Sequence, residues 1–290
     1  MNKPATPLRS VLYAPGVNRR ALEKAASLPI DALILDLEDA VSPDAKAEAR
    51  ATVVDVLASV DYGFRKRVVR INGLDTDWGA EDIEAVAGTA ADAILLPKVE
   101  TPTAVSEALS ALDSAGAHPD LPIWVMAETP RGIMNSAAIA GADPRLEVIV
   151  MGTSDLAKEL RVRHTPQREG LVTSLGLCML AARLHGLDIL DGVHLDLQDA
   201  EGYQLACEQG RNMGFDGKTL IHPKQIEPAN QVFGISDDDF LQAEAIVTAW
   251  QQAQQAGKGV CVVNGRLIES LHVEEAQRMI SMHRAIHART

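Results

Sequence analysis

The sequence predicts an α/β protein built as a closed (β/α)8 barrel with a helical extension at its carboxyl end, and three observations indicate this fold. Short apolar, β-branched segments recur along the chain, and most are continuously apolar, which is typical of strands buried on both faces. Segments with apolar residues at three- and four-residue spacing lie between them, as expected for amphipathic helices. The chain has 290 residues, slightly more than the ~250 residues of one such barrel.

The apolar segments define eight strands, and the capping residues define several helix starts. Ser42-Pro43 and Thr101-Pro102 each place a capping residue before a proline that suits a first helical turn, and Ser236 precedes three aspartates. An open doubly wound sheet would use the same units, but no G-x-G-x-x-G motif follows the first strand, which disfavours it. The strands are Ser10–Ala14, Ala32–Leu37, Arg67–Ile71, Ala93–Pro97, Ile123–Ala127, Val148–Met151, Asp188–Leu190 and Lys218–Ile221.

The pattern changes after Phe240, so we expect a catalytic barrel over residues 1–235 and an extension over 236–290 that serves as a lid or subunit contact. In the extension, a long helix runs to about Gln255. After a break at 257–259, a short apolar run and a final helix from about Val273 follow.

Composition narrows the function classes. Aromatic residues make up only 3% of the chain, so the core must consist mainly of Ala, Val, Ile and Leu. The net charge of −13 opposes nucleic-acid binding, which needs a basic face. The three cysteines form no CxxC motif, which favours a reducing compartment. No signal peptide and no apolar run of the ~18 residues that span a membrane is evident. We therefore expect a cytoplasmic protein with a small-molecule ligand and no membrane or nucleic-acid partner.

Charged residues are expected at the carboxyl ends of the strands and nowhere inside them. In a barrel these ends meet at one rim, where barrel enzymes place their active sites. The polar residues at strand ends are Asp36, Glu38, Asp39, Arg70, Asn72, Lys98, Glu100, Glu128, Arg131, Asp155 and His222.

This rim has the composition of a magnesium site. Its carboxylates are hard oxygen ligands, and no cysteine is among them, which favours Mg²⁺ over Zn²⁺. Glu128 and Asp155 end neighbouring strands and are the expected metal ligands. The alternative for either carboxylate is a helix cap. Arg70 is expected to pair with Asp36 or Glu38 and also to bind a substrate carboxylate or enolate oxygen.

The roles of several other polar residues are less well defined by the sequence. Lys98 would serve as a Schiff-base lysine or as an electrostatic partner of the acids after the second strand, and the acids favour the second role. His222 is interpreted as a hydrogen-bonded structural residue. Arg19, Arg20 and Lys24 follow the first strand and are either phosphate ligands or a solvated helix face.

Six segments also carry a resemblance to a known family. They read RSVLYAPG, DALILDLEDAVSPDAKAEAR, VRINGLDT, LLPKVE, ETPRGIMN and GFDGKTLIHPKQIEPAN. The chain resembles, in order and over nearly its whole length, the citrate lyase β-subunit-like (HpcH/HpaI aldolase/citrate lyase) family. Residues 152–183 look closest to the free-standing malyl-CoA and citramalyl-CoA lyases. The resemblance implies a (β/α)8 barrel, usually a homotrimer, that uses Mg²⁺ and a coenzyme A thioester.

The resemblance also implies residue roles at the rim. Glu128 and Asp155 match the magnesium carboxylates, and Arg70 matches the arginine beside the thioester carbonyl. Asp36, Glu38 and Asp39 match the family's acidic motif after the second strand, and we assign catalytic roles to Asp36 and Glu38.

Further roles are implied outside this group. Lys24, with Arg19 or Arg20, falls where family members contact coenzyme A. Many members place an aspartate from a neighbouring subunit's tail, in a GxMIDxP-like motif, over the active site. Here residues 265–271 read GRLIESL, so Glu269 takes the place of the aspartate and the proline is missing.

These expectations combine into a retro-Claisen cleavage of a malyl-CoA or citramalyl-CoA type of ester, which yields acetyl-CoA and an α-keto acid. Glu128 and Asp155 would hold the metal that chelates the substrate, and Arg70 would stabilise the enolate. Glu269 would protonate the enolate, and amides near Gly152 and Thr153 would hold the keto-acid carboxylate. Two alternatives stay open: hydrolysis of malyl-CoA, and a citrate lyase β subunit that acts on citryl-acyl carrier protein.

Overall fold

A computed structural model describes residues 6–289 of the chain. Their contacts divide them into two compact units. The larger is Leu8–Val232, and the smaller comprises the residues from Phe233 onward together with those before Leu8.

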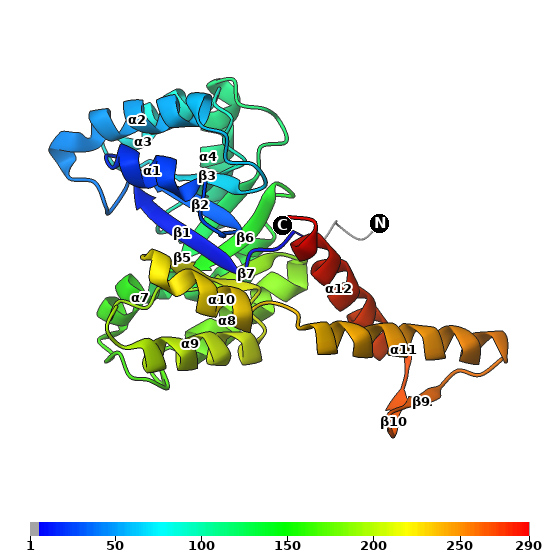
Figure 1. The fold of residues 1–290 in the computed structure, drawn as a ribbon. Coiled ribbons are helices and arrows are strands. Elements are labelled where there is room, and N and C mark those ends of the chain that lie inside the picture. Colours follow the sequence, from blue (N-terminus) through cyan, green and yellow to red (C-terminus); the bar gives the residue numbers. More distant parts are fainter. Residues whose placement is uncertain (1–5, 290) are drawn as a thin grey trace. The chain divides into compact units, whose positions relative to one another are not determined.

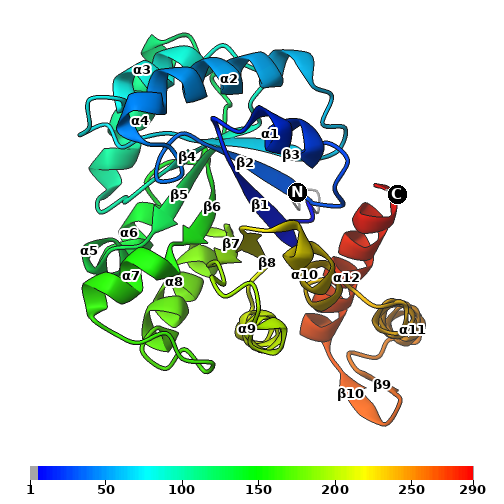
Figure 2. The ribbon, with the colours of Figure 1, turned by 60° about the vertical axis from the view of Figure 1, so that its left-hand side comes forward.

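The larger unit contains a closed barrel of eight strands, each parallel to its neighbours, in the order β1 to β8 (Figures 1 and 2). This confirms the predicted fold, and each strand lies within two residues of its predicted bounds at either end. The strands are β1 Ser10–Pro15, β2 Ala32–Asp36, β3 Lys66–Arg70, β4 Ala93–Leu96, β5 Ile123–Ala127, β6 Leu146–Met151, β7 Asp188–Asp191 and β8 Gly217–Leu220.

Helices cover the outside of the barrel (Figure 2). Thr101 caps α4 by accepting a hydrogen bond from the amide of Ala104, as its place before Pro102 predicts. The helical segments are α1 Arg19–Ala25, η1 Pro43–Ala45, α2 Lys46–Ser59, α3 Gly79–Val86, α4 Pro102–Ser114, α5 Pro130–Met134, α6 Ser136–Ala140, α7 Thr153–Leu160, α8 Val172–His185, α9 Ala200–Met213, η2 Pro223–Gln225 and α10 Ile226–Val232.

The barrel interior is filled by side chains at alternate positions of the strands. Val11 on β1 faces Ala32 on β2, and Trp124 on β5 faces Val148 on β6, and all four are buried in one cluster. Full burial of a side chain as large as valine or leucine stabilises the fold by about 1.5–3 kcal/mol. The barrel is therefore a packed core that holds the strand ends in place.

Charged side chains do lie inside three strands, at Arg67 in β3, Glu147 in β6 and Lys218 in β8, so the expectation that strand interiors carry none is wrong. Lys218 within β8 is 1% exposed, and its Nζ lies 2.8 Å from Asp191 Oδ2 on β7. Arg168 donates to the same carboxylate at 2.7 Å. Burial alone would raise the pKa of Asp191, but Lys218 and Arg168 hold it below its ordinary value. Mutual pairing lets these charges be buried.

A repeated aspartate arrangement stabilises the amino ends of the strands. Asp31 accepts from both the amide and the guanidinium of Arg9 on the adjacent segment, at 2.8 and 2.9 Å. Asp92 holds the amide and guanidinium of Arg67 in the same way, at 2.8 Å each. At this rim each of these acids is paired with an arginine. The groups suited to catalysis lie at the opposite rim.

The smaller unit contains two helices and a hairpin, namely α11 Asp237–Gln255, β9 Cys261–Val263, β10 Arg266–Ile268 and α12 Ser270–His287. Ser236 caps α11 as predicted, by accepting from the amide of Asp239. The strands pair antiparallel around Asn264-Gly265, whose φ angles are 49° and 77°. Asn-Gly is a strong hairpin signal, and this turn joins the apolar run expected after residue 259 to the final helix.

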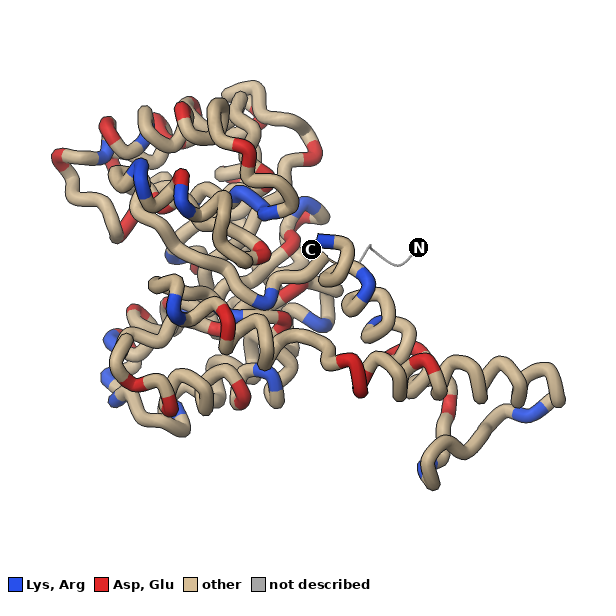
Figure 3. Tube along the Cα trace, in the orientation of Figure 1, with Lys and Arg blue, Asp and Glu red and all other residues tan. Residues whose placement is uncertain are grey.

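Lys and Arg positions are interspersed with Asp and Glu positions along the larger unit (Figure 3). Within the described residues, no helix is both long and apolar enough to cross a membrane.

Removal of the buried Asp191 carboxylate should strongly destabilise the barrel. Asp191→Asn leaves Lys218 and Arg168 without a counter-charge, so the free energy of unfolding should fall by about 3–5 kcal/mol. Urea unfolding followed by circular dichroism measures this change. Asp196→Asn, on the exposed loop that follows, is the matched control and should change stability by less than about 0.5 kcal/mol. Equal stabilities for the two variants would contradict the role of the network.

Candidate active site

The candidate site lies at the carboxyl ends of β2 to β6, where the chain leaves each strand for a helix. Arg70 is the last residue of β3. Glu38, Lys98 and Glu128 follow β2, β4 and β5, and Asp155 lies in the first turn of α7, which follows β6. The structure brings the first four into one hydrogen-bonded group, to which Asp155 contributes charge.

Arg70 is the centre of this group. Its Nε and Nη2 donate to the two oxygens of Asp36 at 2.7 and 2.6 Å, and its Nη1 lies 2.8 Å from Glu38 Oε2. The guanidinium also lies over the ring of Tyr13, 4.9 Å from the centroid. The expected ion pair with Asp36 or Glu38 is confirmed for both acids. A buried guanidinium held at two edges has one orientation and offers a fixed positive charge.

Asp36 holds both the loop after β2 and the side chain of Arg70. Its oxygens accept the backbone amides of Glu38 at 2.9 Å and Ala40 at 3.2 Å, in addition to the two bonds from Arg70. A carboxylate with four donors has no vacant oxygen aimed at a substrate. Asp36 therefore acts by holding other groups, whereas Glu38 reaches further into the site.

Sequence analysis missed the group that supports this loop. The Nζ of Lys46 donates to the carbonyls of Leu37 and Glu38 at 2.8 and 2.7 Å, and to Asn72 Oδ1 at 2.7 Å. Asn72 in turn donates to Asp82 on α3 at 2.6 Å. Lys46 lies near the start of a helix, and its residue type alone does not distinguish it from a surface lysine.

Lys98 contacts two acids through different atoms. Its backbone amide donates to Glu128 Oε1 at 2.8 Å, and its Nζ lies 3.2 Å from Glu38 Oε1. Burial would lower the pKa of Lys98, but the charge of Glu38 raises it above its ordinary value. The ammonium form is favoured, which confirms Lys98 as an electrostatic partner of the acids and opposes a Schiff base.

Glu128 is the most perturbed acid at the rim. Burial raises its pKa to about 7, and the charges of Glu38 and Asp155 act in the same direction. The amide of Lys98 and the charge of Arg70 oppose this shift. Gly152 lies directly against the Glu128 side chain, where a Cβ would clash with its carboxylate. A buried carboxylate crowded by like charges is stabilised by a cation, so the donor set fits a bound Mg²⁺.

The segment after β6 contains three further residues that were predicted to belong to the site. Gly152 N–H donates to the carbonyl of Ala127 at 3.1 Å, so this amide is engaged within the barrel. Amides in the first turn of a helix have no partner within the helix, and Thr153 and Asp155 belong to that turn of α7. Of the two amides predicted to hold a carboxylate, the one at Thr153 is therefore better placed.

A groove of about 860 Å³ lies beside the site, between the loops that follow β2, β3 and β4. Glu38, Lys98, Trp78 and Glu107 are among the residues that line it. Its lining carries more acids than bases, which disfavours phosphate groups there. The lining acids are Glu38, Asp39, Asp75, Glu100, Glu107 and Glu159, and the bases are Lys46 and Lys98.

The predicted coenzyme A contacts lie on α1, which follows β1. Arg19, Arg20 and Lys24 are all exposed. Arg19 is paired with Glu23 at 2.8 Å and with Asp55 at 2.6 Å, as a solvated helix face would be. Arg20 and Lys24 therefore remain the more available cations of the three for a phosphate.

Two other predicted residues have structural roles in the described chain. His222 caps η2 by accepting from the amide of Lys224 at 3.1 Å, which confirms the structural interpretation. Glu269 belongs to the smaller unit, is exposed, and caps α12. Its catalytic role from a neighbouring subunit stays a prediction.

Tyr13 is a site residue that sequence analysis missed. It lies on β1 two residues after Val11, on the inward side, and its hydroxyl contacts Met126 Sδ at 3.8 Å. Burial holds its pKa well above the ordinary value, so the phenol stays protonated. A single aromatic residue at an inward position of an apolar strand was the available signal.

Comparison with known proteins decides the family. The model of the HpcH/HpaI aldolase/citrate lyase family matches residues 9–223, which include the whole barrel. The chain belongs to this family. The predicted resemblance is therefore confirmed.

Named relatives of this HpcH/HpaI-family protein have several activities. It is 52% identical to a (3S)-malyl-CoA thioesterase of Cereibacter sphaeroides, over 98% of the chain and 97% of the relative. It is 34% identical to the citrate lyase subunit beta of Leuconostoc mesenteroides (96% and 94%). It is 32% identical to an L-malyl-CoA/beta-methylmalyl-CoA lyase of C. sphaeroides (96% and 95%). The family thus supports a coenzyme A ester lyase or a related activity, but carbon–carbon cleavage itself is not established by these relatives.

A solved structure provides a matching fold. CitE of Mycobacterium tuberculosis, in complex with magnesium, acetoacetate and coenzyme A, superposes with a TM-score of 0.77 at 30% identity, over 97% of this chain and 98% of that one. Magnesium and coenzyme A binding thus occurs within this family.

The raised pKa of Glu128 predicts a pH-dependent stability in metal-free protein. Because the folded pKa of about 7 exceeds the unfolded one, folding is progressively disfavoured as pH rises from about 4.5 to 7, by about 3 kcal/mol in total. Glu128→Gln removes this effect, so the variant should gain stability relative to wild type between pH 5 and pH 8. Urea unfolding in the presence of a chelator measures the difference, and a difference independent of pH would contradict the assignment.

Proposed function

We propose that this protein is a magnesium-dependent thioesterase that hydrolyses a malyl-CoA type of 3-hydroxyacyl-CoA ester to the free acid and coenzyme A. The observation that carries this proposal is the 52% identity to a (3S)-malyl-CoA thioesterase, against 34% and 32% to a citrate lyase subunit and a malyl-CoA lyase. This was an alternative in the sequence analysis, where cleavage of the carbon–carbon bond was favoured.

The rim supplies groups suited to this reaction. Glu128 and Asp155 would hold Mg²⁺, which, when bound, orients the substrate's carboxylate and hydroxyl oxygens and polarises its carbonyl. Arg70, fixed by Asp36 at 2.6 and 2.7 Å, provides a positive charge for the oxyanion that develops on the thioester oxygen. This charge requires no rearrangement during the reaction, because the surrounding acids already orient the guanidinium.

Glu38 is the best-placed candidate for proton transfer. Burial raises its pKa above the ordinary value, although Arg70 and Lys98 oppose the shift, and a raised pKa improves a carboxylate as a base. Water would attack the thioester carbonyl carbon and give its proton to Glu38. The carbon–sulfur bond then breaks, and the proton passes to the sulfur of the leaving coenzyme A.

Carbon–carbon cleavage is the second candidate. The same Arg70 would stabilise a thioester enolate, and Glu269 of a neighbouring subunit would protonate it, as the 32% identical malyl-CoA lyase suggests. A third candidate, action on a citryl-carrier protein, is supported by the 34% identical citrate lyase subunit.

Several predictions accompany these candidates as proposals. They are a homo-oligomeric assembly, specifically a homotrimer, a cytoplasmic location, coenzyme A contacts at Arg19, Arg20 and Lys24, and a catalytic domain that ends at residue 235.

Product analysis with malyl-CoA distinguishes the candidates. We expect malate and free coenzyme A in equal amounts, with magnesium required, and no glyoxylate. Glu128→Gln should reduce this activity at least ~100-fold because a metal ligand is lost. Glu84→Gln, on the exposed face of α3, is the control and should retain activity. Formation of acetyl-CoA and glyoxylate would instead establish the lyase, and activity confined to a citryl-carrier protein would establish the subunit.

Arg70→Lys tests the oxyanion role. A lysine keeps the charge but loses the two-edged contact with Asp36, so kcat should fall roughly 10²–10³-fold. The matched control is Arg67→Lys on the same strand, at the opposite end of the barrel, where the partner is Asp92. That variant should lose some stability but keep kcat. Equal losses of kcat in both variants would show a general effect on folding.

A further inference from the structure

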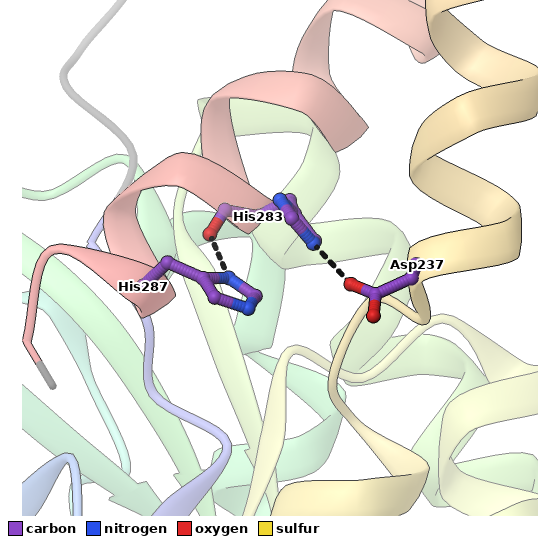
Figure 4. Close-up of side chains that lie close together, drawn as sticks. All are labelled: Asp237, His283 and His287. Atoms are coloured by element: carbon purple, nitrogen blue, oxygen red, sulfur yellow. Dashed lines mark hydrogen bonds and ion pairs between the residues drawn. The ribbon is translucent and has the colours of Figure 1, made fainter.

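The smaller unit contains a cluster of metal-binding side chains that the proposed reaction does not use. Asp237 is the first residue of α11, and His283 and His287 lie one turn apart in the last part of α12. One possible ligand atom from each of the three lies within 4.8 Å of those of the other two. Figure 4 shows that His283 and Asp237 point toward each other from the two helices.

His283 is held in a fixed orientation. Its Nε2 lies 3.1 Å from Asp237 Oδ1, and its ring stacks on Phe240 with a centroid distance of 4.1 Å. The ring centroid of His287 lies 4.0 Å from that of His283. Only 8% of His283 is exposed, so its ring is confined before any ligand arrives, which lowers the entropy cost of coordination.

His287 is oriented by its own helix. Its Nδ1 lies 2.9 Å from the carbonyl oxygen of His283 (Figure 4). Metal-binding histidines commonly donate one ring nitrogen to a carbonyl, which fixes the tautomer and leaves the other nitrogen to the metal. With Nδ1 as donor here, Nε2 is the ligand atom of His287.

We propose that Asp237, His283 and His287 form a binding site for a divalent transition-metal ion of the zinc class. Two imidazoles and one carboxylate match the ligands that Zn²⁺ takes, whereas Mg²⁺ prefers an all-oxygen site. Three protein ligands leave a fourth position for water. The Asp237 side chain is 85% exposed, so an ion reaches the site directly from solvent.

A metal at this position would join the start of α11 to the end of α12. The two helices lie in the same unit, and the first turn of α11 carries three aspartates, Asp237, Asp238 and Asp239. A bound cation would offset the repulsion among these charges and close the helical pair at this end. Without a metal, His283 and Asp237 form a hydrogen-bonded pair beside the ring of His287, and this is the competing interpretation.

The test is a titration of the untagged 290-residue chain with Zn²⁺ after treatment with a chelator, in excess Mg²⁺ that occupies the proposed barrel site. We expect one Zn²⁺ to bind per chain at this cluster, and Co²⁺ in its place to give the visible absorption of a tetrahedral nitrogen–oxygen site. Asp237→Asn and His287→Gln should each weaken Zn²⁺ binding at least ~10-fold. Both residues lie at the surface, and circular dichroism verifies that each variant is folded.

Two control variants separate this site from other ligands. His118→Gln changes an exposed histidine in the loop before β5, and Glu128→Gln removes the proposed magnesium ligand, so both should keep the Zn²⁺ site. Unchanged Zn²⁺ affinity in either Asp237→Asn or His287→Gln would overturn the proposal. So would the lack of micromolar Zn²⁺ binding by the wild type, which would leave only the histidine–aspartate pair. Neither result depends on the catalytic activity.

Discussion

The buried pair between Arg70 and Asp36 is the interaction on which the candidate site depends. It joins the carboxyl ends of β2 and β3, and the remaining hydrogen bonds of Asp36 set the course of the loop that carries Glu38. A guanidinium at this depth is stable only because acids satisfy its donors. The same acids also fix the orientation of the Arg70 guanidinium. The orientation of Glu38 and, through it, the position of Lys98 follow from this one pair.

The two ends of the barrel use charge for different purposes. At the amino ends, Asp31 and Asp92 each receive an amide and a guanidinium, so their charges are neutralised locally. At the carboxyl ends, acids outnumber bases. Burial raises the pKa of Glu128 to about 7, and the charges of Glu38 and Asp155 add to this shift. An uncompensated rim of this kind is stabilised by a cation. This division explains how relatives with the same barrel include lyases and a thioesterase, because only one rim carries the chemistry.

The fold and most rim residues could be predicted from the sequence, because strand periodicity and the polarity of strand ends are local properties. Lys46 and Asp191 could not, since their roles depend on partners 26 and 27 residues away, Asn72 and Lys218 respectively. The hairpin around Asn264-Gly265 had a local signal that was overlooked. The reaction was least predictable: hydrolysis and carbon–carbon cleavage can use the same metal carboxylates and the same arginine, so motifs alone do not separate them.

The backbone of Lys98 has a consequence for the evolution of this site. Its φ of 48° lies in the left-handed region, which costs a non-glycine residue roughly 1–2 kcal/mol. Glycine would relax this torsion and still present its amide to Glu128, but it would remove the ammonium group beside Glu38. Selection for a more robust fold and selection for turnover therefore favour different residues at this position. The lysine at this position combines local strain with a second cation at the rim.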